Sequence, residues 1–551
     1  MFPPGTDTSG HVVVQSLPVA VEKSVSPSVQ QDVSSDEKKA YNVEVLESPD
    51  SPAESIISIH QPYSQQIVGT RLQRWGAVLL KFARFTGPGT LISVAYVDPD
   101  NFQTALDAGA QFQYKLLFII LLGVLMAALA TKLGCVTGLN LAQMNRAYLP
   151  RWLNYFIYAI AEAAIISTDI GQVIGTAIAI NILFPKVPLV GGCAISICDT
   201  LFILAFYKAD GTLRRLRIFE AFVALFIIGV FTSFCIELSF VTDPAADVFK
   251  GFLPSKEIFV SNGLFQSCAI LGGILMPHSL YLGSGFVQHR MRDFDVTSGT
   301  LHEARASNTK YAITLYRPTI SAIKSCMKYS IAEMCISLFV ITLFVNSAIL
   351  IVAANSLGAD ASNADLPAIY HLFVQTIGQA SGTIFALALL FSGVSAGIVC
   401  TMAGQLICEG ALDWRMKPFY RRLLTRSVSV IPAIIIAASE GQRGLAAALN
   451  GCNVVLSVAL IFLTFPLIWY TSCKRYMRVK VDERATPLGV VDGIMNYDAV
   501  RAVEAGGAVE GTVCMANNWP TTIAAGVVWL IVTVFNVATL TFLGLGIGSE
   551  N

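Results

Sequence analysis

Apolar segments about as long as a bilayer is thick dominate the chain from residue 85 onward. Hydrophobic residues make up 54% of the 551 residues and charged residues only 13%, whereas about 25% charged is usual in soluble domains. Each apolar segment approaches the roughly 20 residues that a helix needs to cross a membrane. The eleven segments are 85–108, 114–133, 153–184, 187–206, 218–241, 264–287, 329–354, 382–408, 423–438, 445–473 and 521–547. We therefore predict an all-α integral membrane protein with eleven spans, surrounded by the lipid bilayer.

The charge and cysteine content exclude several other kinds of protein. The net charge is zero, so nothing favours a nucleic-acid partner. The twelve cysteines include no CxxC pair, which argues against a zinc or disulfide framework. We interpret the cysteines as small buried residues within the apolar segments.

Residues 1–67 differ in composition from the rest of the chain. They are rich in Ser, Pro, Val, Gln and acidic residues and lack a sustained apolar period, so we expect a disordered cytosolic tail and not a signal peptide. Residues 48–52 (SPDSP) resemble a modification or sorting segment, and an unmodified linker is the favoured alternative. Such a tail could bind trafficking or ubiquitination machinery, which is the class of partner that we expect for it. The transporter domain is then 68–547.

Basic residues predict the orientation of the spans. Loops that carry Lys and Arg stay in the cytosol, and they fall on one side of the predicted membrane. They contain Arg71, Arg74, Lys81, Arg84, Arg146, Arg151, Arg214, Arg215, Arg217, Arg290, Arg292, Arg305, Lys310, Arg415, Lys417, Arg421, Arg422, Lys474, Arg475 and Arg478. The opposite loop at 355–381 has acidic residues and no basic one. This pattern puts the N-terminus in the cytosol and, with an odd number of spans, Asn551 outside.

Two of the apolar segments are interrupted by proline and polar residues. The first interruption is 95–101 (AYVDPDN) and the second is 272–279 (GGILMPHS), in the first and sixth spans. Proline removes a backbone donor and breaks the helix, leaving carbonyls that need other partners inside a membrane. A pair of broken helices in corresponding positions indicates an inverted repeat with a binding site near the midplane. The repeats would be 85–241 and 264–473, and 521–547 would be an added helix. The alternative is that both prolines only kink structural helices.

These residues resemble a known family. The first-span sequence Asp98-Pro99-x-Asn101 and the sixth-span sequence Met276-Pro277-His278 are similar to the natural resistance-associated macrophage protein (Nramp) family of proton-coupled divalent-metal transporters, and to its fungal members in particular. TDI at 168–170 followed by VIGTA at 173–177 in the third span adds to the match. The resemblance implies a LeuT-type fold with a 5+5 inverted repeat plus an eleventh helix. It also implies a transporter, not an enzyme, that uses no cofactor.

The interrupted segments offer both hard and soft ligands for a transported metal ion. Carboxylate and carbonyl oxygens suit Mg²⁺, Ca²⁺ and Mn²⁺ alike, whereas a thioether sulfur is of no use to Mg²⁺ and Ca²⁺ and is tolerated by Mn²⁺, Fe²⁺, Co²⁺ and Cd²⁺. We therefore predict that Met276 sets selectivity, although a methionine on an apolar helix ordinarily only packs. The other expected ligands are Asp98, Asn101, the backbone carbonyls of Ala95 and Gly273 and, from the resemblance, Asn453.

The resemblance also implies a set of residues for proton coupling. They are Asp98, His278, Glu162, Asp169 and Arg426. Asp169 and Arg426 are expected to form an ion pair inside the membrane, because ionisable groups are costly there unless they are paired. The alternative is that Glu162, Asp169 and Arg426 only tie helices together.

Several positions depart from the common family pattern. Asp100 stands where glycine is usual, and Gly273 replaces an alanine. Gln172 stands where many members have glutamate, and Gly283 replaces a second histidine, so proton routes through those groups are open to question. Asn453 occupies the place of a longer glutamine, which weakens its assignment as a ligand.

The sequence thus predicts a proton-coupled symporter of Mn²⁺, Fe²⁺ and related ions that moves metal into the cytosol by alternating access. Two alternatives stay open: a LeuT-type carrier of another substrate, and an Nramp-like membrane sensor that does not transport. The expected location is the plasma membrane or an endosomal, Golgi or vacuolar membrane.

Overall fold

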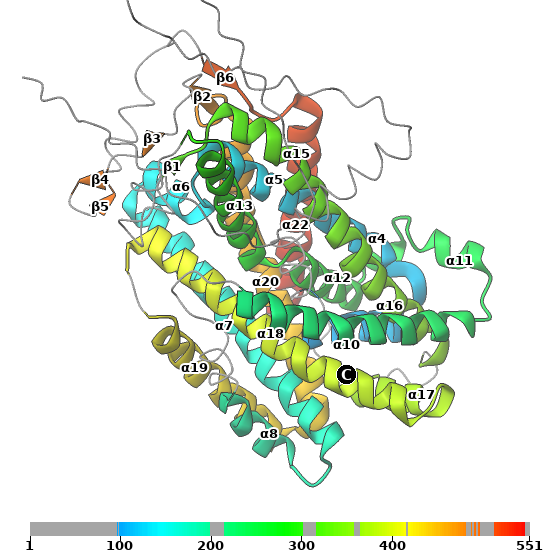
Figure 1. Ribbon diagram of the computed structural model, residues 1–551. Helices are drawn as coiled ribbons and strands as arrows, with labels where there is room; N and C mark the ends of the chain where they lie inside the picture. The colour runs from blue at the N-terminus through cyan, green and yellow to red at the C-terminus, as the bar shows by residue number, and fades with distance from the viewer. Residues whose placement is uncertain are drawn as a thin grey trace, which may run out of the picture. The chain divides into compact units, whose positions relative to one another are not determined.

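The computed structural model describes residues 96, 98–198, 214–300, 316–357, 364–414, 417–480, 486–487, 490–491, 494–495 and 512–545. This part of the chain is almost entirely helical (Figure 1). The predicted tail at 1–67, its SPDSP segment and Ala95 lie outside the described residues. The division of the chain into domains therefore stays a prediction.

The helices follow one another with short connections. They are α3 (Pro99–Phe112), α4 (Leu117–Ile120), α5 (Val124–Thr137), α6 (Leu141–Tyr148), α7 (Arg151–Leu183), α8 (Leu189–Ile195), α10 (Arg214–Ser239), α11 (Ala245–Lys250), α12 (Ser261–Leu275), α13 (Pro277–Thr297), α15 (Ile320–Ser337), α16 (Phe344–Ser356), α17 (Leu366–Thr376), α18 (Gln379–Leu412), α19 (Pro418–Ser439), α20 (Gly441–Ser472) and α22 (Trp519–Gly544). Single 3₁₀ turns cover Gln113–Leu116, Leu121–Gly123, Ser196–Cys198 and Lys256–Phe259, and a π-helical stretch, Leu338–Leu343, joins α15 to α16.

Six short strands form three antiparallel pairs outside the helices. They are β1 (Tyr316–Arg317), β2 (Arg478–Lys480), β3 (Thr486–Pro487), β4 (Val490–Val491), β5 (Ile494–Met495) and β6 (Thr512–Cys514). β1 pairs with β3, β2 with β6 and β4 with β5. In register, Val479 lies opposite Val513, and Tyr316 lies opposite Pro487.

The helices confirm the prediction of a multi-pass membrane protein. Eight helical stretches in the described part of the chain are long and apolar enough to cross a membrane. The first, Pro99–Thr137, covers parts of the first two predicted spans, and two shorter apolar helices, Leu189–Cys198 and Ile227–Ser239, match the fourth and fifth. Large apolar side chains remain exposed on the outer helices, for example Ile431 on α19 and Leu530 on α22. Such exposure is stable in lipid and costly in water.

Two of the helix boundaries that differ from the sequence-based assignment involve arginines. Arg421 and Arg422, predicted to lie in a cytosolic loop, belong to α19 and are buried. Arg290 and Arg292, also predicted in a loop, lie within α13, which extends to Thr297. The assignment was wrong because a buried acid can neutralise an arginine inside a helix. Arg290 forms such an ion pair with Glu333 of α15.

Glycines set the closest approaches between helices. A Cβ built on Gly109 of α3 would lie 2.2 Å from the backbone oxygen of Leu350 in α16. A Cβ on Gly134 of α5 would lie 2.0 Å from the backbone oxygen of Ser284 in α13. In both cases the neighbour is rigid helix backbone, so the two helices touch only because the side chain is a hydrogen atom.

We predict that Gly109→Ala destabilises the protein by about 1–3 kcal/mol, the usual cost of overpacking. The added methyl group has no room beside Leu350 and forces α3 away from α16. Thermal unfolding in detergent measures the change. The matched control is Gly526→Ala in α22, where no other residue lies within 4 Å of the new Cβ. Equal melting temperatures for both variants would contradict the predicted contact.

Candidate functional site: two broken helices

The first break places Asp98 at the start of α3. Its carboxylate Oδ1 accepts a hydrogen bond from the backbone N–H of Asn101 at 3.0 Å, and Pro99 follows as the first helical residue. Aspartate as the cap and proline in the first turn is a favoured helix start. The side-chain amide of Asn101 donates to the backbone oxygen of Tyr96 at 2.9 Å. The local sequence therefore starts α3 at this point and holds two oxygen-bearing side chains at its N-terminus.

The second break lies at Met276, between α12 and α13. Met276 has φ 32° and ψ 100°, a left-handed conformation that is uncommon for residues other than glycine. The carbonyl of Gly273 cannot receive its usual helical hydrogen bond, because the residue four positions later is Pro277, which has no N–H. The same spacing relates Ala95 to Pro99. A strained methionine and a freed carbonyl thus lie within one turn of each other.

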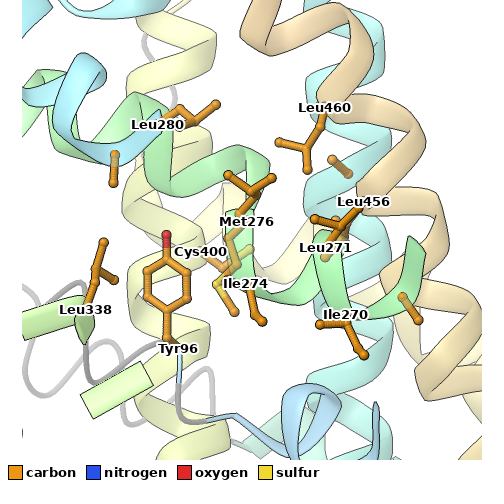
Figure 2. Packing of buried hydrophobic residues seen from close by; sticks show 14 of the residues in the cluster. Tyr96, Ile270, Leu271, Ile274, Met276, Leu280, Leu338, Cys400, Leu456 and Leu460 are labelled. Carbon is orange, nitrogen blue, oxygen red and sulfur yellow. The ribbon is translucent and has the colours of Figure 1, made fainter. Parts of the chain in front are cut away.

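The two breaks meet. The Tyr96 hydroxyl and the Ser279 hydroxyl lie 2.5 Å apart and join the chain before α3 to the start of α13. A Cβ on Gly273 would lie 1.8 Å from Asn101 Oδ1, so the amide oxygen of Asn101 touches the backbone of α12. Figure 2 shows Tyr96 and Met276 within the same buried cluster. Sequence reasoning missed Tyr96 and Ser279, although both lie inside the interrupted segments.

Asn453 of α20 completes this arrangement. Its side-chain nitrogen donates to the backbone oxygen of Asp100 at 3.2 Å and to the Thr104 hydroxyl at 2.9 Å. Its carbonyl oxygen is buried and has no hydrogen-bond partner in the described structure. Asp98, Asn101, Met276 and Asn453 are each at most 4% exposed. The structure therefore gathers four of the predicted side chains, together with Gly273, in one buried polar cluster.

No group of three or more His, Cys, Asp or Glu side chains that could hold a metal occurs among the described residues. Asp100, the extra carboxylate, lies against α7, where a Cβ on Gly171 would be 2.0 Å from its Oδ2. Because Gly171 has no side chain, there is room beside α7 for the carboxylate of Asp100, the position at which the family pattern has glycine.

A second polar centre connects α7 to α19. Asp169 forms ion pairs with Arg422 and with Arg426, the latter at 3.1 Å. Glu162 pairs with Arg421 at 2.5 Å. The expected Asp169–Arg426 pair is thus confirmed, but Arg421 and Arg422 were missed as partners. Arg422 precedes Arg426 by four residues and so lies on the same helix face, which was the available signal for Arg422.

Glycines of α18 give these arginines space. A Cβ on Gly397 would lie 2.5 Å from Arg422 Nη2, and a Cβ on Gly404 would lie 2.6 Å from Arg421 Nε. The two glycines are seven residues apart and so lie on one face of α18. Both guanidinium groups therefore run between α7 and α18.

The remaining departures from the family pattern are also visible. Gln172 Oε1 lies 3.5 Å from Arg422 Nη2 and so adjoins the ion pair where many members have glutamate. His278 is buried in the first turn of α13, and its Nδ1 has no partner among the described residues. A Cβ built on Gly283 would make only ordinary van der Waals contacts, the nearest with Ala130 at 3.6 Å, so packing does not require glycine at this position.

Comparison with known proteins is consistent with this geometry. The chain is 44% identical over 502 residues to the manganese transporter SMF1 of Saccharomyces cerevisiae, covering 86% of this chain and 87% of that protein. It is 46% identical over 411 residues to the iron transporter SMF3 of the same yeast, covering 73% and 84%. A crystal structure of a mutant of the Eremococcus coleocola manganese transporter superposes with a TM-score of 0.65 at 26% identity, covering 88% and 90%.

The family model described as natural resistance-associated macrophage protein-like matches residues 89–491. This range includes both broken helices, the α7–α19 ion pairs and Asn453. The chain belongs to the Nramp family of membrane transporters.

Proposed function

We propose that this protein transports divalent transition-metal ions, Mn²⁺ and Fe²⁺ first and Co²⁺ and Cd²⁺ as well, into the cytosol by alternating access. The observation that carries the proposal is the meeting of the start of α3 with the break between α12 and α13, which gathers the Asp98 carboxylate, the Asn101 and Asn453 carboxamides, the carbonyl of Gly273 and the Met276 thioether in one buried cluster. Relatives that cover most of the chain are named as manganese and iron transporters.

The ligand set explains the choice of metal. Asp98 supplies the charge, and Asn101, Asn453 and the carbonyls of Ala95 and Gly273 supply neutral oxygens. Met276 supplies the soft ligand that Ca²⁺ and Mg²⁺ do not use. Its position at the break, in a conformation that methionine rarely adopts, supports a role beyond packing.

Proton coupling is part of the proposal. Asp98, His278, Glu162, Asp169 and Arg426 are ionisable groups at membrane depth, where such groups are costly and usually functional. Binding of a divalent ion favours the loss of a proton from Asp98. The buried ion pairs with Arg421 and Arg422 extend the set across α7 and α19, which provides a polar connection inside an otherwise apolar domain.

The topology we propose is two inverted five-helix repeats, 85–241 and 264–473, followed by a further helix at 521–547. The distribution of basic residues supports a cytosolic N-terminus, where the tail at 1–67 would be available to trafficking or ubiquitination machinery. The protein acts at the plasma membrane or at an endosomal, Golgi or vacuolar membrane.

We expect purified protein in liposomes to take up Mn²⁺, with faster uptake when the outside is more acidic than the inside. Asp98→Ala is expected to abolish uptake while leaving insertion intact, because it removes the anionic ligand and lowers the cost of burial. Asp247→Ala, an exposed carboxylate on α11, is the control. Absence of uptake by the wild type would favour a sensor or another substrate. Normal uptake by Asp98→Ala would exclude this cluster as the site.

Met276→Ala is expected to change selectivity. With only oxygen ligands left, Mn²⁺ uptake should fall moderately and Cd²⁺ uptake more, whereas Ca²⁺ should compete better than before. Uptake of Mn²⁺ and Cd²⁺ against rising Ca²⁺ in both proteins measures this. If the variant loses both metals equally and Ca²⁺ competes no better, Met276 only packs.

His278→Gln and Asp169→Asn are expected to weaken the dependence of uptake on external acidity more than they weaken metal binding. Both changes remove a titratable group and keep a polar side chain of similar size. Uptake at several external pH values, with Mn²⁺ binding measured separately, provides the comparison. Unchanged pH dependence in both variants would assign the Asp169 ion pairs a structural role alone.

A further inference from the structure

Tyr96 is a buried tyrosine two residues before Asp98. Its side chain is 1% exposed and lies in the apolar cluster that also contains Leu280 and Leu338 (Figure 2). A tyrosine hydroxyl in such surroundings needs a hydrogen-bond partner. Here the partner is Ser279 of α13, at 2.5 Å. The ring thus carries one polar group from the chain before α3 to the second break.

The hydrogen bonds of Ser279 decide which of the two hydroxyl groups donates. Ser279 Oγ lies 2.8 Å from the backbone oxygen of Met276 and 3.3 Å from that of Leu275. A carbonyl oxygen can only accept, so the single hydrogen of the Ser279 hydroxyl is used there. The Tyr96 hydroxyl therefore donates to Ser279 Oγ, and Ser279 donates onward to the backbone at the second break.

The backbone of Tyr96 holds one of the predicted ligands. Its carbonyl oxygen accepts a hydrogen bond from Asn101 Nδ2 at 2.9 Å. With the nitrogen occupied in this way, the amide oxygen of Asn101 is the atom that touches α12, where a Cβ on Gly273 would lie 1.8 Å from Oδ1. Tyr96 is therefore bonded at its backbone to Asn101 and, through the Ser279 hydroxyl, at its side chain to Met276.

Met276 is the residue in this cluster whose backbone most needs such support. A φ of 32° is unfavourable for methionine and persists only where the surrounding structure fixes it. The Met276 carbonyl oxygen accepts from the backbone N–H of Ser279 at 2.9 Å and from the Ser279 hydroxyl. The Tyr96 hydroxyl holds that serine from the other side, so the strained break is tied to the chain before α3.

We propose that Tyr96 is a positioning residue that holds the metal ligands of the two breaks at a fixed separation before the ion arrives. The inference rests on the proposed function, because it takes Asn101 and Met276 as ligands of the transported ion. In this role the Tyr96 side chain is not itself a ligand. Its hydroxyl restrains the start of α13, so the ion does not have to bring the two breaks together on binding. Such preorganisation improves affinity without adding a contact to the ion.

Tyr96→Phe removes the hydroxyl and keeps the packed ring. We expect it to raise the KM for Mn²⁺ about fivefold, the effect of losing one net hydrogen bond. The value of kcat should stay nearly unchanged, because neither a ligand nor an expected proton carrier is removed. The matched control is Tyr470→Phe, which removes a buried hydroxyl that has no partner among the described residues. An unchanged KM in Tyr96→Phe, or a loss of kcat alone, would overturn the proposal.

A double-mutant cycle with Ser279 separates positioning from a general loss of packing. Ser279→Ala breaks the same bond from the other side and should raise the KM at least as much, because it also withdraws a donor from Met276. In that background Tyr96→Phe should have no further effect. In the background of Ser267→Ala, a buried hydroxyl bonded within α12, Tyr96→Phe should keep its full effect. Equal effects in both backgrounds would overturn the proposed link.

Direct Mn²⁺ binding to the protein in detergent completes the experiment, with thermal unfolding to show that each variant is folded. Binding by Tyr96→Phe should weaken by the same factor as its KM rises, and unchanged binding would overturn the positioning role. If the wild type binds and transports Mn²⁺ and Tyr96→Phe equals it, only this inference fails. If the wild type neither binds nor transports Mn²⁺, the proposed function fails and the inference fails with it.

Discussion

The rule that every backbone polar group inside a membrane needs a partner governs this structure. A continuous helix satisfies its own carbonyls, and Pro99 and Pro277 prevent that at two positions. At the second break Met276 adopts φ 32° and Gly273 loses its helical donor. The oxygens freed in this way are costly unless something binds them. A cation bound at the proposed site would offset that cost, because the proposed ligands are the residues of the breaks themselves.

The charged groups of the domain follow a related principle. Asp169 with Arg422 and Arg426, and Glu162 with Arg421, lie between α7, α18 and α19 and are paired at close range. Removing one member of such a buried pair typically costs about 3–5 kcal/mol, because the remaining charge stays buried without compensation. Gly397 and Gly404 contribute by leaving room for the guanidinium groups. The ion pairs in this region therefore depend on the close packing of α18, because a larger residue at Gly397 or Gly404 would occupy the space of a guanidinium group.

A chain of hydrogen bonds between polar side chains links α3 to α20. The hydrogen bonds from Asp107 through Asn450 and Thr104 to Asn453 run between two helices that are far apart in the sequence. Each link is weak in isolation, but in a membrane interior the chain has few competing partners. This arrangement links Asp107, near the end of α3, to Asn453 of α20 through buried hydrogen bonds.

The sequence by itself determined the membrane class, the position of both helix breaks and the types of ligand they carry. These are local properties, since a long apolar run and a proline act on the backbone whatever surrounds them. It also predicted the Asp169–Arg426 ion pair. It did not predict Arg421 and Arg422 as partners, the contact between Tyr96 and Ser279, or the chain ending at Asp107. These contacts depend on which helices pack against each other. That packing is close at glycines such as Gly109, Gly134 and Gly397. The sequence alone does not show it, because each glycine fits against a residue that only the tertiary structure brings near.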